Sequence, residues 1–312
     1  MLAVSEFPWV SVSGFGAHIK STQRTLTIQK KGSITEYPLE SVRHLLIVGG
    51  HTIGSSTINN LVKAGASVSF FESDGTPVGT IRPYCEESHP NLWELQQGIP
   101  RQRFAIALAQ GSVKSRLFAI EKAEEQQESG LLYEGELEIL HNSLNEIGYL
   151  IKLEEIRRLH RLTSDMYYEI MARSLPATSG FRRRTVRPQV DPVNAMLSFG
   201  YAMLYGACSV SVIGAHLNPD RGFMFEGKGS LVMDLIEPIK AHMIDTVVFT
   251  IGKEPFTPAD YECTSDRCLL SDDLIKKLMA SFYTTINTTK INEQVLGILN
   301  AIRDNQEFTV LY

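Results

Sequence analysis

The chain has 312 residues, 43% of them hydrophobic and 21% charged, and this length predicts about two domains with cores large enough to fold without crosslinks. A formal net charge of −5 argues against a surface covered with basic patches, although local clusters of Lys and Arg can still bind nucleic acid. Four irregularly spaced cysteines are too few for a disulfide scaffold, which favours a reducing, cytoplasmic environment. We interpret the C-x4-C pair, Cys263 and Cys268, as loop or packing cysteines in preference to a zinc site.

The first part of the chain, residues 1–82, has the patterns of β-strands. Period-two alternation or short apolar runs predict strands over residues 9–12, 25–28, 33–37, 45–48, 66–71 and 78–81. Lys31-Gly32 and Asp74-Gly75 are turn signals. A short helix is expected over residues 57–64, with Ser55 or Ser56 as its N-cap and Gly65 closing it.

A change of pattern marks residues 83–100, which are rich in proline and glycine and are predicted to be a linker. Helical patterns dominate residues 101–312. We expect helices over 103–127, 134–147, 150–175, 193–213, 230–244, 271–283 and 291–304. The apolar segment from Val193 is interrupted by Asn194 and Gly200, so we predict a core helix and no membrane span. The fold class is therefore α+β, with a β-rich part followed by a larger α-helical part.

Acidic residues at helical spacing are the clearest chemical feature. Asp234 and Glu237 are separated by three residues, so both carboxylates can lie on one face of a helix. Mg²⁺ and Mn²⁺ prefer oxygen ligands of this kind. Glu169 lies in another predicted helix with apolar neighbours. The alternative is that all three acids lie on solvated helix faces.

Four arginines, at positions 182, 183, 184 and 187, lie just before the apolar helix. Their guanidinium groups suit phosphate oxygens, which predicts a contact with nucleic acid. The alternative is a surface loop whose arginines pair with nearby acids.

Several strings, taken together, resemble one known family. They are DPVNAMLSFGY from Asp191, N-P-x-x-G-F from Asn218, and S-L-x-x-D-L-x-E-P from Ser230, with an E-x-x-A segment at Glu169 before them. Segments of the N-terminal part, such as Gly14 to Ile19 and Leu61 to Ala66, follow the order seen in the same family. The chain thus resembles the CRISPR adaptation integrase, the Cas one family.

The resemblance implies an N-terminal β-sandwich-like domain that forms a homodimer and a C-terminal α-helical domain that binds DNA and carries catalysis. It implies a Cas two partner, insertion of short DNA by transesterification, and endonuclease activity. No membrane is expected among the partners. A Mg²⁺ or Mn²⁺ ion would be held by Glu169 and Glu237, with Asp234 beside them. The predicted DNA-binding residues are Arg182, Arg183, Arg184, Arg187, Arg221 and Lys228.

One position departs from the family pattern. The family places a metal-binding histidine at the end of G-F-x-H, where this chain has Phe225. Candidate substitutes are Glu226, His216 and His242. Two hypotheses follow: an active metal-dependent integrase and endonuclease with an altered site, or a catalytically weakened homologue that acts in DNA binding or assembly.

Overall fold

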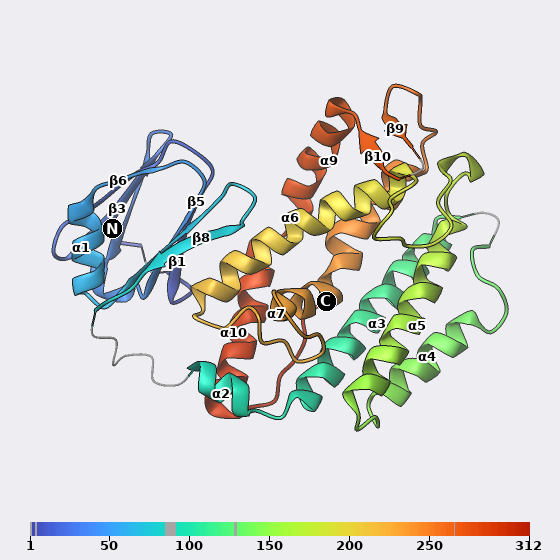
Figure 1. The fold of residues 1–312 in the computed structure, drawn as a ribbon, viewed down its shortest axis with the longest axis horizontal. Coiled ribbons are helices and arrows are strands. Elements are labelled where there is room, and N and C mark those ends of the chain that lie inside the picture. Colours follow the sequence, from blue (N-terminus) through green and yellow to red (C-terminus); the bar gives the residue numbers. More distant parts are fainter. Residues whose placement is uncertain (1, 4, 85–91, 128–129, 265) are drawn as a thin grey trace. The chain divides into compact units, whose positions relative to one another are not determined.

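Strands occupy the N-terminal part of the chain and helices most of the remainder in the computed structural model (Figure 1), which describes residues 2–3, 5–84, 92–127, 130–264 and 266–312. The predicted α+β fold class, strand-rich first and helical afterwards, is confirmed. Cys85 and the rest of 85–91 lie outside the described residues.

The chain divides into two compact units. The first consists of Met1–Ile99, Tyr205–Arg221 and Ile291–Glu307, and the second of Pro100–Leu204, Gly222–Lys290 and Phe308–Tyr312. The break after Ile99 falls at the end of the expected linker, but the helical part is not one continuous domain. One reason is a close approach at Gly214, where a Cβ atom would lie 2.7 Å from Leu46 and 3.0 Å from Trp9. The end of a helix therefore packs directly on the strands.

Two four-stranded sheets make up the strand region. The first has the order β1-β5-β7-β8, parallel except for the antiparallel pair β7–β8, and the second has the order β4-β3-β2-β6, antiparallel except for the parallel pair β2–β6. The strands are β1 (Trp9–Ser13), β2 (His18–Ser21), β3 (Thr25–Lys30), β4 (Ser33–Pro38), β5 (His44–Val48), β6 (Thr52–Ile53), β7 (Ser67–Phe71) and β8 (Pro77–Ile81).

Both sheets and one helix contribute to a single apolar core. Val12 and Ile47 come from the first sheet, Ile19 and Leu26 from the second, and Leu61 from helix α1 (Ser55–Lys63). β5 is buried at all five positions, as its continuous apolar run predicted, because β1 and β7 flank it in a parallel arrangement.

Most predicted elements of this region are present. Gly65 has a φ of +82°, which fits its expected place after α1, whereas the N-cap of that helix is Gly54 and neither Ser55 nor Ser56. The prediction missed β2 and β6, which are short and lack a clear alternation of apolar residues.

The remaining elements are helices, two short 3-10 turns, one π-helical segment and a two-stranded hairpin. The helices are α2 (Leu92–Gly98), α3 (Arg101–Glu125), α4 (Glu136–Ile147), α5 (Leu153–Ala172), α6 (Pro192–Gly214), α7 (Ser230–Lys240), α8 (Thr246–Gly252), α9 (Asp272–Thr285) and α10 (Thr288–Asp304). The short segments are η1 (Leu39–Ser41), η2 (Ala177–Ser179) and the π-helical η3 (Ala241–Asp245), and the hairpin strands are β9 (Tyr261–Cys263) and β10 (Cys268–Leu270).

α6 is the one helix among the described residues that is long and apolar enough to cross a membrane. In its most apolar window 56% of the residues are buried within the protein. A core helix passes the same test of length and composition, and this burial agrees with the predicted core helix.

Candidate functional site

Asp234 anchors the loop that precedes α7. Its carboxylate is fully buried and accepts hydrogen bonds from three consecutive backbone N–H groups. Oδ2 accepts from Phe223 and from Met224, the latter at 3.1 Å, and Oδ1 accepts from Phe225 at 2.8 Å. Burial raises the pKa of this carboxyl to about 7, although the three N–H donors oppose the rise. Both oxygens of Asp234 are therefore engaged in holding the loop.

Glu237, one turn further along α7, lies at the centre of a buried group of charges. Arg116 on α3 donates to Oε2 at 2.9 Å, and Lys240 on α7 donates to Oε1 at 2.7 Å. His160 Nε2, on α5, is 3.2 Å from the same Oε2. The four residues, here called the Glu237 cluster, are each at most 9% exposed.

The neighbouring side chains of the cluster determine the ionisation of Glu237. Burial alone would raise the pKa of the Glu237 carboxyl, but the Lys240 ammonium, the His160 hydrogen bond and the Arg116 guanidinium hold it well below its ordinary value. Burial lowers the pKa of His160, so its imidazole is neutral near pH 7. Because a carboxylate oxygen can only accept, the tautomer with its hydrogen on Nε2 is the one that bonds to Glu237. Glu237 is thus an ionised carboxylate with two cationic partners and one neutral donor.

These partners do not fit a Mg²⁺ or Mn²⁺ ion on Glu237. Hard divalent ions need several oxygen ligands, whereas Glu237 is surrounded by N–H donors, two of them positively charged. Among the residues that the structure describes, no group of three or more His, Cys, Asp or Glu side chains is arranged to hold a metal ion. The contacts of Glu237 therefore give no support to the predicted convergence of Glu169, Asp234 and Glu237 on one ion, which stays a prediction.

Glu169 fails to join the cluster for a geometric reason. It lies on α5 nine residues after His160, and nine residues at about 100° each place it on the opposite face of the helix. The buried face of α5 carries Ile156, His160, Thr163, Tyr167 and Ile170, and Glu169 is exposed. Glu169 therefore lies on an exposed helix face, as the alternative expects.

Phe225 and its candidate substitutes have other surroundings. Phe225 is half-buried with its ring edge-on to His160, at 6.3 Å between ring centroids. Glu226 is exposed and pairs with Arg101 at 3.1 Å and Arg157 at 2.7 Å. His216 belongs to the first unit, where it stacks on His44, and His242 is exposed on η3. None of these three side chains has Glu237 as a partner in the contacts described.

A chain of tyrosines and an aspartate extends the cluster. Tyr168 donates to Tyr201 at 2.6 Å, and Tyr201 donates to Oδ1 of Asp245. Lys240 Nζ lies 5.3 Å from the centre of the Tyr201 ring. Burial raises the pKa of Asp245 to about 6, although the Tyr201 hydroxyl, Lys240 and Arg116 oppose the rise. A polar interior therefore runs from Glu237 to η3.

The arginine-rich segment contains two kinds of side chain. Arg182, Arg183 and Arg187 are exposed, as is Lys228, so all four can reach a phosphate. Arg184 is half-buried and donates to Asn194 Oδ1 and Ser198 Oγ, both at 2.9 Å. The half-buried Arg221 lies in the first unit and donates to the Gln97 carbonyl at 3.4 Å. Arg184 thus has a structural position, and the exposed residues remain candidates for DNA contacts.

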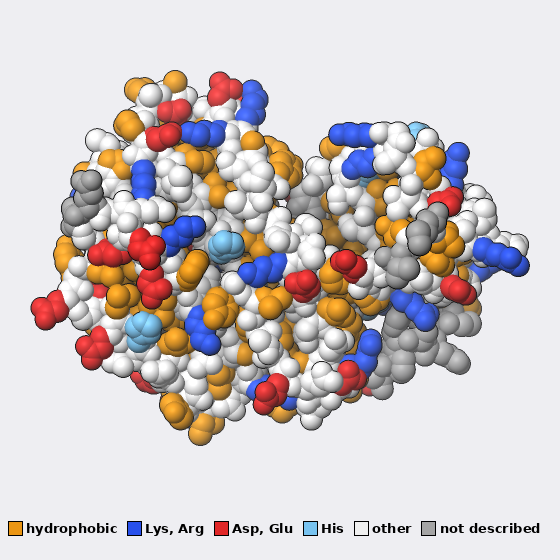
Figure 2. Space-filling model, turned by 180° about the vertical axis from the view of Figure 1, so that it is seen from behind, with side chains coloured by type: hydrophobic (Ala, Val, Ile, Leu, Met, Phe, Trp, Pro, Cys, Tyr) orange, Lys and Arg blue, Asp and Glu red, His pale blue; other side chains and the backbone are white. Residues whose placement is uncertain are grey.

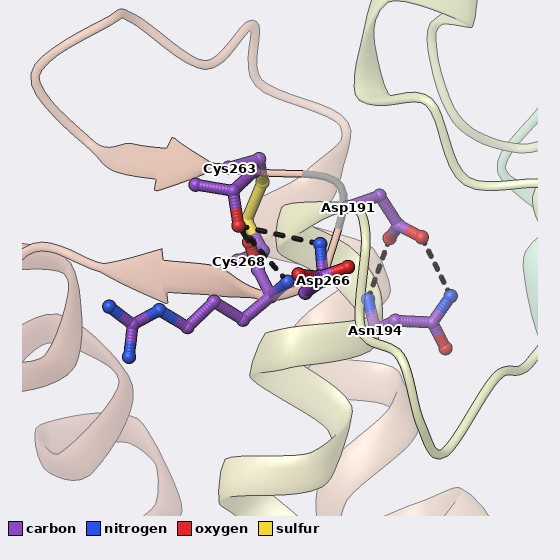
Figure 3. The surroundings of a disulfide bond; sticks show 7 residues. Asp191, Asn194, Cys263, Asp266 and Cys268 are labelled. Carbon is purple, nitrogen blue, oxygen red and sulfur yellow. Dashed lines mark hydrogen bonds between the residues drawn. A yellow bond between two sulfur atoms is a disulfide. The ribbon is translucent and has the colours of Figure 1, made fainter.

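The start of α6 explains the DPVNA string in structural terms (Figure 3). Asp191 accepts from the backbone N–H of Asn194 at 2.8 Å and from its side chain at 2.7 Å, as an N-cap residue does, and Pro192 is the first helical residue. Asn194 also donates to the carbonyl of Arg183 and accepts from the N–H of Thr185. The string therefore holds the arginine-rich segment against α6.

Figure 3 also shows the hairpin β9–β10, in which Cys263 and Cys268 form a disulfide. The interpretation as loop or packing cysteines did not include this bond, which is possible because the antiparallel pairing sets the two residues directly opposite each other. Spacing alone does not reveal such a register. Cys208 is free and buried, and burial raises the pKa of its thiol.

The sequence-based reasoning missed three members of the Glu237 cluster: Arg116, His160 and Lys240. One signal was available, since Lys240 follows Glu237 by three residues and so lies on the same helix face. Arg116 and His160 lie 121 and 77 residues before Glu237, so only the packing of α3 and α5 against α7 identifies them.

Comparison with known proteins assigns the chain to a family. The family model described as CRISPR associated protein Cas1 matches residues 10–284. The chain belongs to the Cas1 family. A Cas1 relative from Methanospirillum hungatei JF-1, named a putative CRISPR-associated endonuclease Cas1, is 42% identical over 301 residues, which are 96% of this chain and 99% of the relative.

Solved structures show the same fold. A casposase bound to its integration product aligns with a TM-score of 0.81 at 17% identity, over 96% of this chain and 97% of the casposase. A chain of a partial Cas6-RT-Cas1–Cas2 complex aligns with a TM-score of 0.77 at 20% identity, over 97% and 98% of the two chains. The Cas1 fold of this chain therefore carries an ion-paired cluster at Glu237.

Proposed function

We propose that this Cas1-family chain is a DNA-binding subunit of a CRISPR adaptation complex, whose own metal-dependent strand transfer is weak or absent. The observation that carries the proposal is the pairing of Glu237 with Arg116 and Lys240, since these cations occupy both oxygens of the carboxylate that the resemblance assigns to a metal. The related complex containing Cas1 and Cas2 supports a Cas2 partner, and the casposase bound to its integration product supports DNA as ligand.

In this function the exposed arginines hold DNA by its phosphates. Arg182, Arg183 and Arg187 project from a segment that Asn194 fastens to α6, so their backbone is fixed while their guanidinium groups remain accessible. Because phosphate contacts carry no sequence information, this part of the site would bind DNA of any sequence.

A second function is favoured by the 42% identity to a protein named an endonuclease, over nearly the full length of both chains. In this alternative the chain is itself a Mg²⁺- or Mn²⁺-dependent endonuclease and integrase. It requires the Glu237 cluster to open, with Arg116 and Lys240 leaving the carboxylate before an ion can bind.

The test combines binding and strand transfer with the full chain and a Cas2 partner. Short labelled duplex DNA is titrated with the protein, and insertion into a plasmid that carries a CRISPR repeat is followed on gels. Both assays are run with excess Mn²⁺ and with EDTA. We expect DNA binding that EDTA does not weaken and little or no joined product. Efficient joining that needs Mn²⁺ would favour the second function and contradict the first.

A further inference from the structure

The Glu237 carboxylate is neutralised entirely by fixed side chains. Arg116 Nη2 and Lys240 Nζ each bind a different oxygen, at 2.9 and 2.7 Å, and the three side chains are buried. Ser112 Oγ donates to the Glu237 backbone carbonyl at 3.1 Å, which adds a second tie between α3 and α7. The cluster therefore joins three helices, α3, α5 and α7, through one carboxylate.

The two buried cations carry the same total positive charge as a divalent ion, and two buried acids lie near them. Asp245 is fully buried and interacts electrostatically with both Lys240 and Arg116. Glu237 and Asp245 together carry two negative charges when ionised, and Arg116 and Lys240 carry two positive charges. The two side-chain cations thus supply the same total charge as one Mg²⁺ or Mn²⁺ ion.

A metal ion and the two cations would exclude one another. Mg²⁺ binds carboxylate oxygens at about 2.0–2.1 Å, so an ion on either oxygen of Glu237 would lie within about 5 Å of Lys240 Nζ or Arg116 Nη2. Like charges at that distance in a buried site repel strongly. His160 offers no compensation, because its Nε2–H donates to Glu237 and cannot coordinate an ion at the same time.

We propose that Arg116 and Lys240 replace a divalent cation at Glu237, so that the chain's own charges hold α3, α5 and α7 together without metal. This inference deepens the proposed function, and it rests on that function for the statement that the chain binds DNA. Arg116 and Lys240 are positioning residues: they act on the packing of the helices and have no contact with DNA.

The first experiment measures thermal unfolding of the wild-type chain in EDTA and in Mn²⁺ or Mg²⁺. The expected shift in Tm between these conditions is below about 1 °C. An ion bound at a hundred times its Kd would instead raise Tm by roughly 5 °C or more. Such a rise, abolished in Glu237→Gln, would overturn the proposal.

The second experiment removes the central charge. Glu237→Gln leaves two buried cations without their shared carboxylate, so Tm should fall by roughly 10 °C in EDTA. The matched control is Glu169→Gln, an identical change at an exposed position, which should leave Tm unchanged. Adding Lys240→Met to Glu237→Gln should recover part of the loss, since one unpaired charge is removed. A Glu237→Gln variant as stable as wild type would contradict the proposal.

The third experiment, which does not depend on a severely destabilised variant, converts the site. Lys240→Met frees Oε1 of Glu237, the oxygen that Arg116 does not bind, and Phe225→His places an imidazole where the Phe225 ring lies, 6.3 Å from the His160 ring. The double variant should gain a Mn²⁺-dependent rise in Tm that neither wild type nor Phe225→His has. If Phe225→His alone gains the same rise, Lys240 does not exclude the ion and the proposal fails.

The two proposals can fail separately. Suppose that the wild-type chain joins DNA only with Mn²⁺, while its Tm does not change with Mn²⁺. This result would contradict the proposed function and would leave the proposal on Arg116 and Lys240 standing. A Tm that rises with Mn²⁺ in a chain that joins no DNA would contradict only the proposal that Arg116 and Lys240 replace a divalent cation.

Discussion

Individual arginines of the same segment have different roles, because one of them is tied into the fold. Arg184 bonds to Asn194 and Ser198 and lies 5.4 Å from the centre of the Tyr201 ring. Arg182, Arg183 and Arg187 are exposed. A cluster of identical residues therefore divides into a structural member and three candidates for phosphate contacts.

This division predicts two separate effects of substitution. Replacing Arg182, Arg183 and Arg187 together by Ala should weaken DNA binding and flatten its salt dependence by up to about 0.9 log-log slope units per lost contact, with unchanged Tm. Arg184→Ala should instead lower stability by about 1–3 kcal/mol, because it leaves buried polar groups without a partner. Fluorescence anisotropy across a salt series and thermal unfolding measure the two effects. An unchanged salt slope in the triple variant would indicate a DNA surface elsewhere.

At the scale of elements, α7 organises the site through both of its acids. Asp234 fixes the loop before the helix, Glu237 ties the helix to α3 and α5, and the chain continues into the π-helical η3 without a break. A π-helical turn changes the facing of the residues that follow, and here Asp245 ends that turn with its side chain buried.

The loop before α7 requires a residue without a side chain at position 222. A Cβ atom on Gly222 would lie 2.8 Å from Asp234 Oδ2 and 2.9 Å from the carbonyl oxygen of Phe225. Gly222→Ala should therefore displace the loop and cost about 1–3 kcal/mol of unfolding free energy, measured in urea. Gly79→Ala is the control, since nothing lies within 4 Å of the added atom, and it should be nearly neutral. Equal stability of the two variants would contradict the prediction.

Asp245 predicts a pH dependence of stability. Its pKa is raised to about 6, so the folded state binds this proton more tightly than the unfolded state does. The stabilisation from the proton is fully present below about pH 4 and is lost as the pH rises through about 6, a change of about 3 kcal/mol. Asp245→Asn cannot titrate, so the difference between its stability and that of wild type should change between pH 4 and pH 7. Parallel stability curves over this range would contradict the assignment.

At the scale of the whole molecule, charge and exposed apolar surface indicate different kinds of partner. Lys and Arg side chains are mixed with Asp and Glu on the face shown in Figure 2, in agreement with the net charge of −5. We therefore expect DNA binding to depend on a local set of cations such as the three exposed arginines. In the first unit the edge strand β8 is exposed along its whole length, including Val78 and Ile81. Exposed apolar edge strands favour pairing with another chain.

We therefore predict a homodimer that uses the strand-rich unit, as the resemblance implied. Light scattering at micromolar concentration should give twice the mass of one chain. Val78→Lys on β8 should shift the equilibrium towards monomer, whereas Ile139→Lys, at a similarly exposed position on α4, should not. A wild-type chain that is monomeric under these conditions would contradict this prediction.

The sequence by itself determined the local elements and the family. Hydrophobic periodicity and turn residues predicted six of the eight strands in the two sheets and most helices, because these patterns report which face of an element is buried. The strings around Asp191 and Asp234 identified the family, and both residues hold a loop in place: Asp191 caps α6, and Asp234 accepts from the N–H of Phe225 in the loop before α7.

Only the tertiary structure decided what surrounds Glu237. Sequence spacing relates residues on one helix, so it could associate Asp234 with Glu237, but it holds no information on which face of α5 meets α7. That packing buries His160, leaves Glu169 exposed, and brings Arg116 to Glu237 from 121 residues away. The disulfide and the two-unit division depend on register and helix packing in the same way. The partners of a buried charge depend on contacts that are distant in sequence, and those contacts exist only in the folded chain.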